Sequence, residues 1–233
     1  MRNPRPQDFE YILLPGKVGS EFEATALHNE LFDFWNEFWG EVLLEVTGER
    51  RRLTADDFLR QDSFAVLMYQ NQIIGIHAYS FFNLSSIASA QHSYFEKYFN
   101  KNFLKALQTG NFQNIMTMEY FSVAKDWRAK RIGISLAKLI VVLGLRLARE
   151  CNADGTITAA RADVPAANIA RNLGAISLVD PIEIHTKPTE LMLFPKDCAE
   201  PEASEFKDYL NYLWHSRVNY AIDVNQTSIK KIA

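Results

Sequence analysis

One segment limits the fold more than any other, an apolar run over residues 115–123 that leads through a basic loop into a long apolar stretch. The run has the β-branched and aromatic composition of a strand. The stretch over residues 132–150 has the length and composition of a buried helix. The loop between them carries three cations, Arg128, Lys130 and Arg131. Because such a junction presents unpaired backbone N–H groups and the positive end of a helix dipole, it predicts a site for phosphate or pyrophosphate.

Size and composition narrow the class of protein. With 233 residues and 48% hydrophobic content, the chain can bury one large core, so we expect a single domain over residues 1–233. The net charge of -3 argues against nucleic-acid binding. Two cysteines are too few for a disulfide framework, and no signal peptide is seen, so a cytoplasmic setting is expected. Lys138 and Arg146 interrupt the most apolar stretch, which favours a buried helix over a membrane span.

Strands and helices alternate along most of the chain. Strands are predicted over residues 9–14, 64–69, 73–81, 115–123, 156–160, 176–179 and 191–194. Helices are predicted over residues 22–46, 132–150 and 165–173, with Gly174 as the stop signal of the last. Residues 85–114 form an expected insertion, and residues 200–233 an expected C-terminal helical extension. The pattern predicts an α/β (α+β) fold with a mixed, mostly antiparallel central sheet flanked by helices.

The junction after the strand carries a recognisable motif. Val123 ends the strand, and Arg128-Ala129-Lys130-Arg131-Ile132-Gly133 follows. This order resembles the GCN5-related N-acetyltransferase (GNAT) superfamily, whose signature is a strand ending in valine, then Arg/Gln-x-x-Gly-x-Gly/Ala, then a helix. Gly133 matches the second glycine of the signature, and Arg131 stands in place of the first.

A second motif of the same superfamily fits residues 163–175. The superfamily pattern there is a helix reading Asn-x-x-Ala…Tyr-x-x-Leu-Gly-Phe. Three positions match it directly: Ala166, Leu173 and Gly174. Three others differ, with Asp163 for the asparagine, Ala170 for the tyrosine and Ala175 for the phenylalanine. As a pattern of elements, the resemblance extends over residues 64–194.

The resemblance implies a donor site for acetyl-coenzyme A or another acyl-CoA. The donor would lie in a V-shaped opening between strands 115–123 and 156–160, with its pantetheine arm paired to the end of the first strand. The residues implied in cofactor binding are Val123, Arg128, Ala129, Lys130, Arg131, Ile132, Gly133, Ile134 and Asp163. The five histidines are scattered without metal-ligand spacing, so no metal is expected.

Glu119 is the candidate catalytic residue. It is a carboxylate within an apolar strand, where burial favours a role as general base for the acceptor amine. Strand alternation predicts that Glu119, Phe121 and Val123 share one face and that Tyr120 points to the other. The proton-donating tyrosine of the superfamily falls at Ala170 and is absent. The sequence does not select among the remaining candidates for the acid, His77, Tyr79 and Tyr94.

The implied activity is acyl-CoA-dependent N-acyl transfer to an amine, with N-acetyl transfer the first expectation. One alternative is the same chemistry with a long-chain acyl-CoA or an acyl carrier protein as donor, which the many Phe and Leu residues would suit. A second alternative is a non-catalytic binding module of the same fold. The acceptor is expected to be a small-molecule or peptide amine, with no nucleic-acid or membrane partner. Acceptor specificity or homodimer formation would be encoded in residues 85–114 and in the C-terminal helix.

Overall fold

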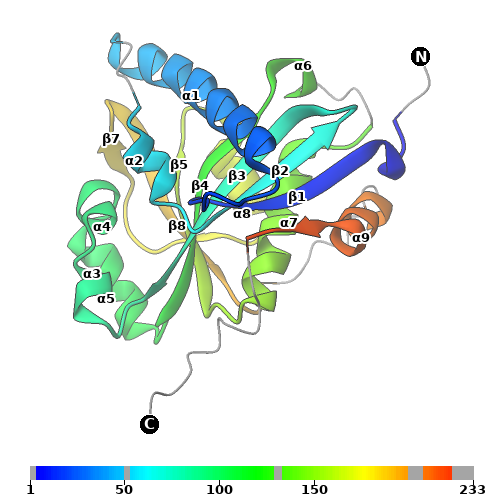
Figure 1. Ribbon diagram of the computed structural model, residues 1–233. Helices are drawn as coiled ribbons and strands as arrows, with labels where there is room; N and C mark the ends of the chain where they lie inside the picture. Colours follow the sequence, from blue (N-terminus) through cyan, green and yellow to red (C-terminus); the bar gives the residue numbers. More distant parts are fainter. Residues whose placement is uncertain (1–3, 50–52, 129–132, 199–206, 222–233) are drawn as a thin grey trace.

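The computed structural model describes residues 4–49, 53–128, 133–198 and 207–221. Within these residues, nine strands form one sheet with the order β6-β8-β5-β4-β3-β2-β1-β9, and β7 pairs with β8 (Figure 1). The strands are β1 (Phe9–Pro15), β2 (Ser63–Tyr69), β3 (Gln72–Asn83), β4 (Asn114–Val123), β5 (Gly155–Arg161), β6 (Ile176–Ser177), β7 (Ile182–Ile184), β8 (Lys187–Pro195) and β9 (Val218–Asn219). Only the β4–β5 and β1–β9 pairs are parallel, which confirms the mostly antiparallel sheet.

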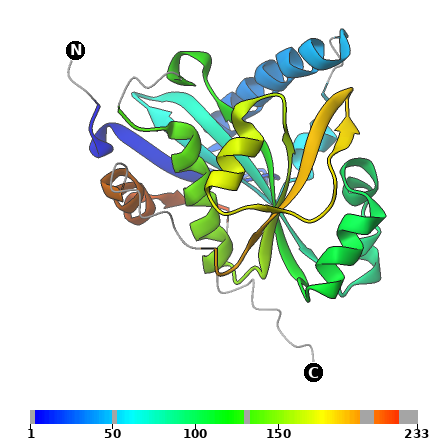
Figure 2. The ribbon, with the colours of Figure 1, turned by 180° about the vertical axis from the view of Figure 1, so that it is seen from behind.

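Helices cover both faces of the sheet, as Figures 1 and 2 show from opposite sides. The helices are α1 (Thr25–Thr47), α2 (Ala55–Leu59), α3 (Ile87–Ala90), α4 (Ser93–Tyr98), α5 (Lys101–Thr109), α6 (Lys125–Arg128), α7 (Leu136–Glu150), α8 (Pro165–Asn172) and α9 (Lys207–Ser216), after a short 3-10 turn at Pro6–Asp8. Helix α1 lies over one face with α2, and α7 and α8 lie over the other. Among the described helices, none has the length and hydropathy needed to cross a membrane.

Two apolar clusters lie on opposite faces of the sheet. Helices α1 and α2 contribute Leu31, Trp35 and Phe58 to the first, which packs on β2 and β3. The second surrounds α7, whose apolar residues are buried almost all round. Burial on this scale stabilises a fold by roughly 25 cal/mol per Å² of apolar surface. It explains why α7 is apolar without being a membrane segment.

The hairpin turn between β2 and β3 sets the register of the residues next to it. Gln70 and Asn71 have φ values of 49° and 61°, the left-handed pair that a tight two-residue hairpin turn requires. Met68 is thereby placed opposite Ile73, and a register shift between Leu67 and Met68 then brings Phe64 opposite Ala78.

The segments outside the alternation pack differently from one another. Helices α4 and α5 bring Phe95, Phe103 and Leu107 into a separate apolar cluster against β5 and β8. Near the C-terminus α9 packs on β1 and α7. The expected helical extension is not helical throughout, because the chain leaves α9 and pairs β9 with the edge of β1. Arg217 fixes this arrangement through two hydrogen bonds of 2.7 Å to the Glu150 carboxylate.

Candidate functional site

Strands β4 and β5 pair only at their beginnings. The parallel pairing joins residues 115–117 of β4 to residues 155–157 of β5. Beyond this point β4 pairs with β3, and β5 pairs with β8. Among the described residues, the β5-facing edge of β4 over residues 118–123 therefore has no strand partner. The two strands diverge where the sequence predicts a V-shaped opening.

A β-bulge lies in β4 at this divergence. The β3–β4 register shifts between Ile76 and Ala78, and Tyr120 adopts a φ of 51°. A bulge adds one residue to a strand and interrupts the alternation of its side chains. Glu119 and Tyr120 consequently face the same side of the sheet, where α1 and α2 lie, as their contacts with Arg60 and with Trp35 show.

The predicted faces of β4 are therefore wrong. Phe121 and Val123 belong to the cluster around α7, so Glu119 does not share a face with them. Tyr120, expected to point away from Glu119, lies on the same side, packed edge-on against Trp35 and Trp39 at ring-centroid distances of 5.3 and 5.2 Å. The physical cause is the extra residue of the bulge.

Glu119 lies in a dense polar cluster beneath α2. Arg60 donates two hydrogen bonds to its two carboxylate oxygens, at 3.1 and 2.6 Å. Thr117 donates a third at 2.8 Å, and the Gln61 amide a fourth at 3.4 Å. The Glu119 side chain is 9% exposed. A bidentate arginine–carboxylate pair of this kind combines charge attraction with fixed geometry, so Glu119 is held in one orientation.

Arg60 and Gln61 are site residues that the sequence did not indicate. Burial alone would lower the pKa of Arg60, but its hydrogen bonds with Glu119 raise that pKa overall, so the guanidinium remains charged. The guanidinium also lies 4.6 Å from the ring centroid of Tyr94. Gln61 accepts a hydrogen bond of 3.0 Å from Ser80. Arg60 and Glu119 are 59 positions apart, and no local motif connects them.

The predicted donor residues begin at the end of β4. The Val123 carbonyl accepts a hydrogen bond of 2.8 Å from Arg128 Nε, and the Arg128 guanidinium lies 5.1 Å from the ring centroid of Phe38 in α1. Residues 125–128 form the short helix α6, where the sequence predicted a loop. The four next predicted residues lie outside the described residues: Ala129, Lys130, Arg131 and Ile132.

The start of α7 has the features of the glycine motif. Gly133 adopts a φ of 75°, a left-handed conformation that favours glycine, and a side chain there would meet no neighbour within 4 Å. Ile134 is buried, and the Ser135 hydroxyl caps the helix by accepting a 3.4 Å hydrogen bond from the backbone N–H of Lys138. The structure describes α7 from Leu136, so the helix begins later than the predicted residue 132.

Asp163 lies beyond the end of β5 and is exposed. Arg161 donates hydrogen bonds of 2.9 and 2.8 Å to its carboxylate, and this pairing lowers the pKa of Asp163. Arg161 also contacts Glu45 of α1 at 3.2 Å. Asp163 is therefore part of a surface ion-pair network. Farther along the chain, Gly174 follows α8 with a φ of 94°, as predicted for a helix stop.

Helix α1 connects the ends of the two diverging strands. Trp39 donates a hydrogen bond of 3.0 Å to Ser122 of β4. Glu41 pairs with Lys125 just after β4 at 2.8 Å, and Glu45 pairs with Arg161 at the end of β5. The side of the sheet that holds Glu119 and Tyr120 thus lies beneath one long helix.

Two of the three candidates for the acid lie on the opposite side of the sheet from Glu119. His77 and Tyr79 are buried on the α7 side, and burial lowers the pKa of His77 to about 3, so its imidazole is neutral at physiological pH. Tyr94 is buried against Arg60. Ala170, at the family's tyrosine position, is buried and carries no hydroxyl. No group of three or more potential metal ligands occurs within the described ranges.

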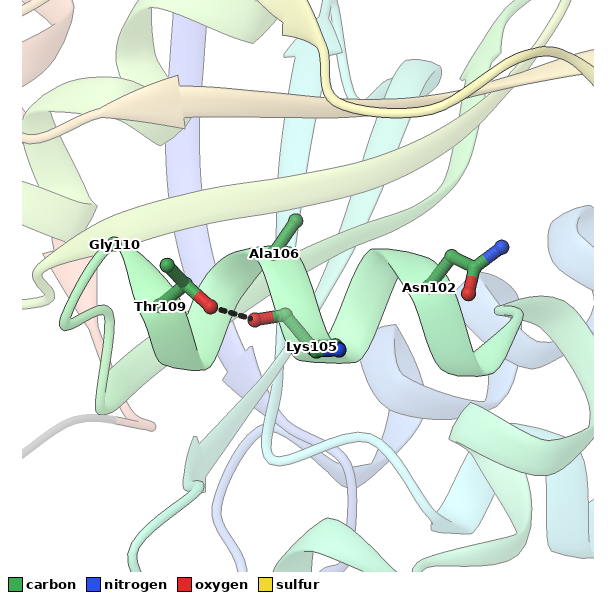
Figure 3. A pocket seen from close by; sticks show the side chains of 5 residues that line it. All are labelled: Asn102, Lys105, Ala106, Thr109 and Gly110. Carbon is green, nitrogen blue, oxygen red and sulfur yellow. Dashed lines mark hydrogen bonds between the residues drawn. The ribbon is translucent and has the colours of Figure 1, made fainter.

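An open concavity of about 500 Å³ lies along α5 (Figure 3). It is lined by Asn102, Lys105, Ala106, Thr109 and Gly110, which belong to one helix and its end. The hydrogen bond that Figure 3 marks there is internal to the helix, from the Thr109 hydroxyl to the Lys105 carbonyl at 2.9 Å. It contains no predicted site residue and lacks the convergent polar groups of a binding site.

Comparison with solved structures identifies the fold. A CoA-dependent acyl-homoserine lactone synthase, BjaI, solved with SAM and isopentyl-CoA, superposes with a TM-score of 0.55 at 8% identity over 94% of this chain and 98% of its own. An agmatine N-acetyltransferase gives 0.55 at 10% identity, over 81% and 99%. The chain has the GNAT fold. FeeM, an N-acyl amino acid synthase from uncultured soil microbes, shares this GNAT fold with a TM-score of 0.51 at 12% identity, over 81% and 92%.

At the level of sequence the likeness is remote. No protein-family model matches the chain, and no curated protein matches it. The GNAT fold is therefore established by structure alone. The resemblance of the two motifs is consistent with it, because Gly133 and Gly174 both have the left-handed backbone for which glycine is suited.

Proposed function

We propose that the protein is an acyl-CoA-dependent N-acyltransferase. The observation that carries the proposal is the divergence of β4 from β5 with Glu119 just past the last paired residues. An unpaired strand edge offers backbone groups to an extended amide-containing arm such as pantetheine, in the manner of an added strand. The start of α7, with Gly133 and the Ser135 cap, would receive the pyrophosphate.

In the proposed reaction the acceptor amine attacks the thioester carbonyl. Glu119 is the proposed general base, and Arg60, Thr117 and Gln61 fix its orientation. The residues proposed to hold the donor are those of the two motifs: Val123, Arg128, Ala129, Lys130, Arg131, Ile132, Gly133, Ile134 and Asp163. The Val123 carbonyl accepts a hydrogen bond from Arg128, so pairing of pantetheine with that carbonyl requires the Arg128 side chain to move.

Acetyl-CoA is the proposed donor, and the acceptor is a small-molecule or peptide amine in a cytoplasmic setting. The similar structures named above include a lactone synthase, an amino acid N-acyl synthase and an agmatine acetyltransferase. Because they differ in acyl group and acceptor, the fold they share restricts neither. A longer acyl-CoA donor is the second candidate. It is supported by the aromatic side chains of Phe34, Phe38 and Trp39, which lie together on α1, with Phe38 in contact with Arg128.

Release of the free CoA thiol tests the proposal. Acetyl-, butyryl- and octanoyl-CoA are each mixed with the protein and with agmatine, amino acids or short peptides, and the thiol is followed with a chromogenic disulfide. We expect amine-dependent thiol release with at least one donor, and the preferred donor separates acetyl from longer-chain transfer. Stabilisation by CoA at millimolar concentration without any turnover would favour the non-catalytic module. The proposed function would be refuted if CoA gave no stabilisation and no donor gave turnover.

A further inference from the structure

The hydroxyl of Tyr120 is a chemical group that the proposed reaction has not used. Tyr120 is the bulge residue of β4, and its φ of 51° turns it onto the side of the sheet that Glu119 occupies. A left-handed backbone is uncommon for a bulky residue and persists only where its surroundings fix it. Trp35 and Trp39 clamp the phenol ring edge-on from α1, and Trp39 donates a hydrogen bond of 3.0 Å to Ser122.

The hydroxyl itself is available. Tyr120 is partly exposed, and its hydroxyl makes no hydrogen bond with a described residue. The charged and titratable groups that face it come from three elements: Tyr98 of α4, Glu119 of β4, and Asp57 and Arg60 in and after α2. The phenol is protonated at neutral pH, and burial raises its pKa further, so its proton moves only when a basic thiolate forms beside it.

We propose that Tyr120 donates the proton that the departing thiolate takes up, in place of the tyrosine that the superfamily carries where this chain has Ala170. The inference rests on the proposed function and adds a residue to it. It needs the ring clamp and the shared face with Glu119, both of which follow from the bulge, and a hydroxyl that has no hydrogen-bond partner among the described residues.

The step balances as a proton circuit. The amine nitrogen forms the C–N bond, and the C–S electron pair leaves with sulfur. Glu119 takes a proton from the attacking nitrogen while the Tyr120 O–H transfers its proton to the sulfur. The proton held by Glu119 then returns to the Tyr120 phenolate. The net products are one amide and one free thiol, and both side chains recover their starting state.

Tyr120→Phe tests the proposal, because phenylalanine keeps the ring between the two tryptophans. The donors are acetyl- and octanoyl-CoA, with the amine that gives thiol release in the wild type. We expect kcat to fall by about 100-fold, the lower end of what general acid catalysis contributes, with an unchanged melting temperature. Tyr212→Phe removes an exposed hydroxyl on α9 and is the control, with wild-type kcat expected.

The binding of CoA and desulfo-CoA provides a second measurement, in which a purely structural role of Tyr120 would produce no difference between the two ligands. If the phenol contacts the sulfur, Tyr120→Phe should weaken binding of CoA by roughly fivefold, the worth of one hydrogen bond, and leave binding of desulfo-CoA unchanged. Equal kcat in wild type and Tyr120→Phe would overturn the inference, as would equal losses for CoA and desulfo-CoA. The inference would also be overturned if Tyr98→Phe lowered kcat while Tyr120→Phe did not. Absence of thiol release from the wild type would instead count against the proposed function.

Discussion

Glu119→Gln is expected to lower kcat by about 10²–10⁴-fold, the usual contribution of a general base. Glutamine keeps the shape of the side chain and can still accept from Thr117, but it cannot take a proton. A base that takes the proton from the attacking nitrogen becomes less necessary as hydroxide takes over that role. The deficit of the variant relative to the wild type should therefore narrow by up to about tenfold per pH unit as the pH rises.

The matched control for this variant is Glu190→Gln. Glu190 of β8 is also a poorly exposed carboxylate paired with an arginine, Arg171, yet it lies outside the proposed site. Initial rates between pH 6 and pH 10 measure both variants against the wild type. A Glu119→Gln deficit that stays constant over this range would show that Glu119 does not act as a base, and wild-type activity in the variant would remove it from the mechanism.

Arg60→Met is expected to destabilise the fold by about 3 kcal/mol, because it leaves the Glu119 carboxylate without its cation in a site where that side chain is 9% exposed. For a chain of this length the corresponding fall in melting temperature is roughly 6–12 °C. Calorimetry or denaturant unfolding measures it. The double variant with Glu119→Gln should recover much of the loss, since no unpaired charge then remains buried.

Arg171→Met is the control for the arginine. Its side chain is 44% exposed, against 17% for Arg60, and Glu190 keeps its 2.9 Å hydrogen bond from Ser177, so the expected cost is smaller, about 1 kcal/mol. Equal costs for Arg60→Met and Arg171→Met would mean that the Arg60–Glu119 pair is solvated. Additivity of Arg60→Met and Glu119→Gln would mean that the two side chains are not coupled.

The sequence predicted the elements that local chemistry determines. The strand over residues 115–123, the buried helix that α7 forms and the turn between β2 and β3 all follow from composition, periodicity and turn residues. Gly133 and Gly174 could be identified because glycine is the residue suited to left-handed backbone. These features were sufficient to indicate the GNAT fold.

The candidate site was only partly predictable, because its defining contacts are long-range. A β-bulge has no sequence mark of its own, so alternation misplaced Phe121, Val123 and Tyr120 relative to Glu119. Arg60 reaches Glu119 across a separation of 59 positions, and neither residue lies in a motif that names the other. The helix α6 replaced an expected loop because Trp127 packs into the α7 cluster.

Amide hydrogen–deuterium exchange with and without CoA tests the central claim, that the edge of β4 freed by its divergence from β5 is the donor site. At millimolar CoA we expect slower exchange over residues 118–123 and at Gly133 to Ser135, with no change in β1 or in α5. Unchanged exchange in β4, or protection confined to the concavity along α5, would contradict the account.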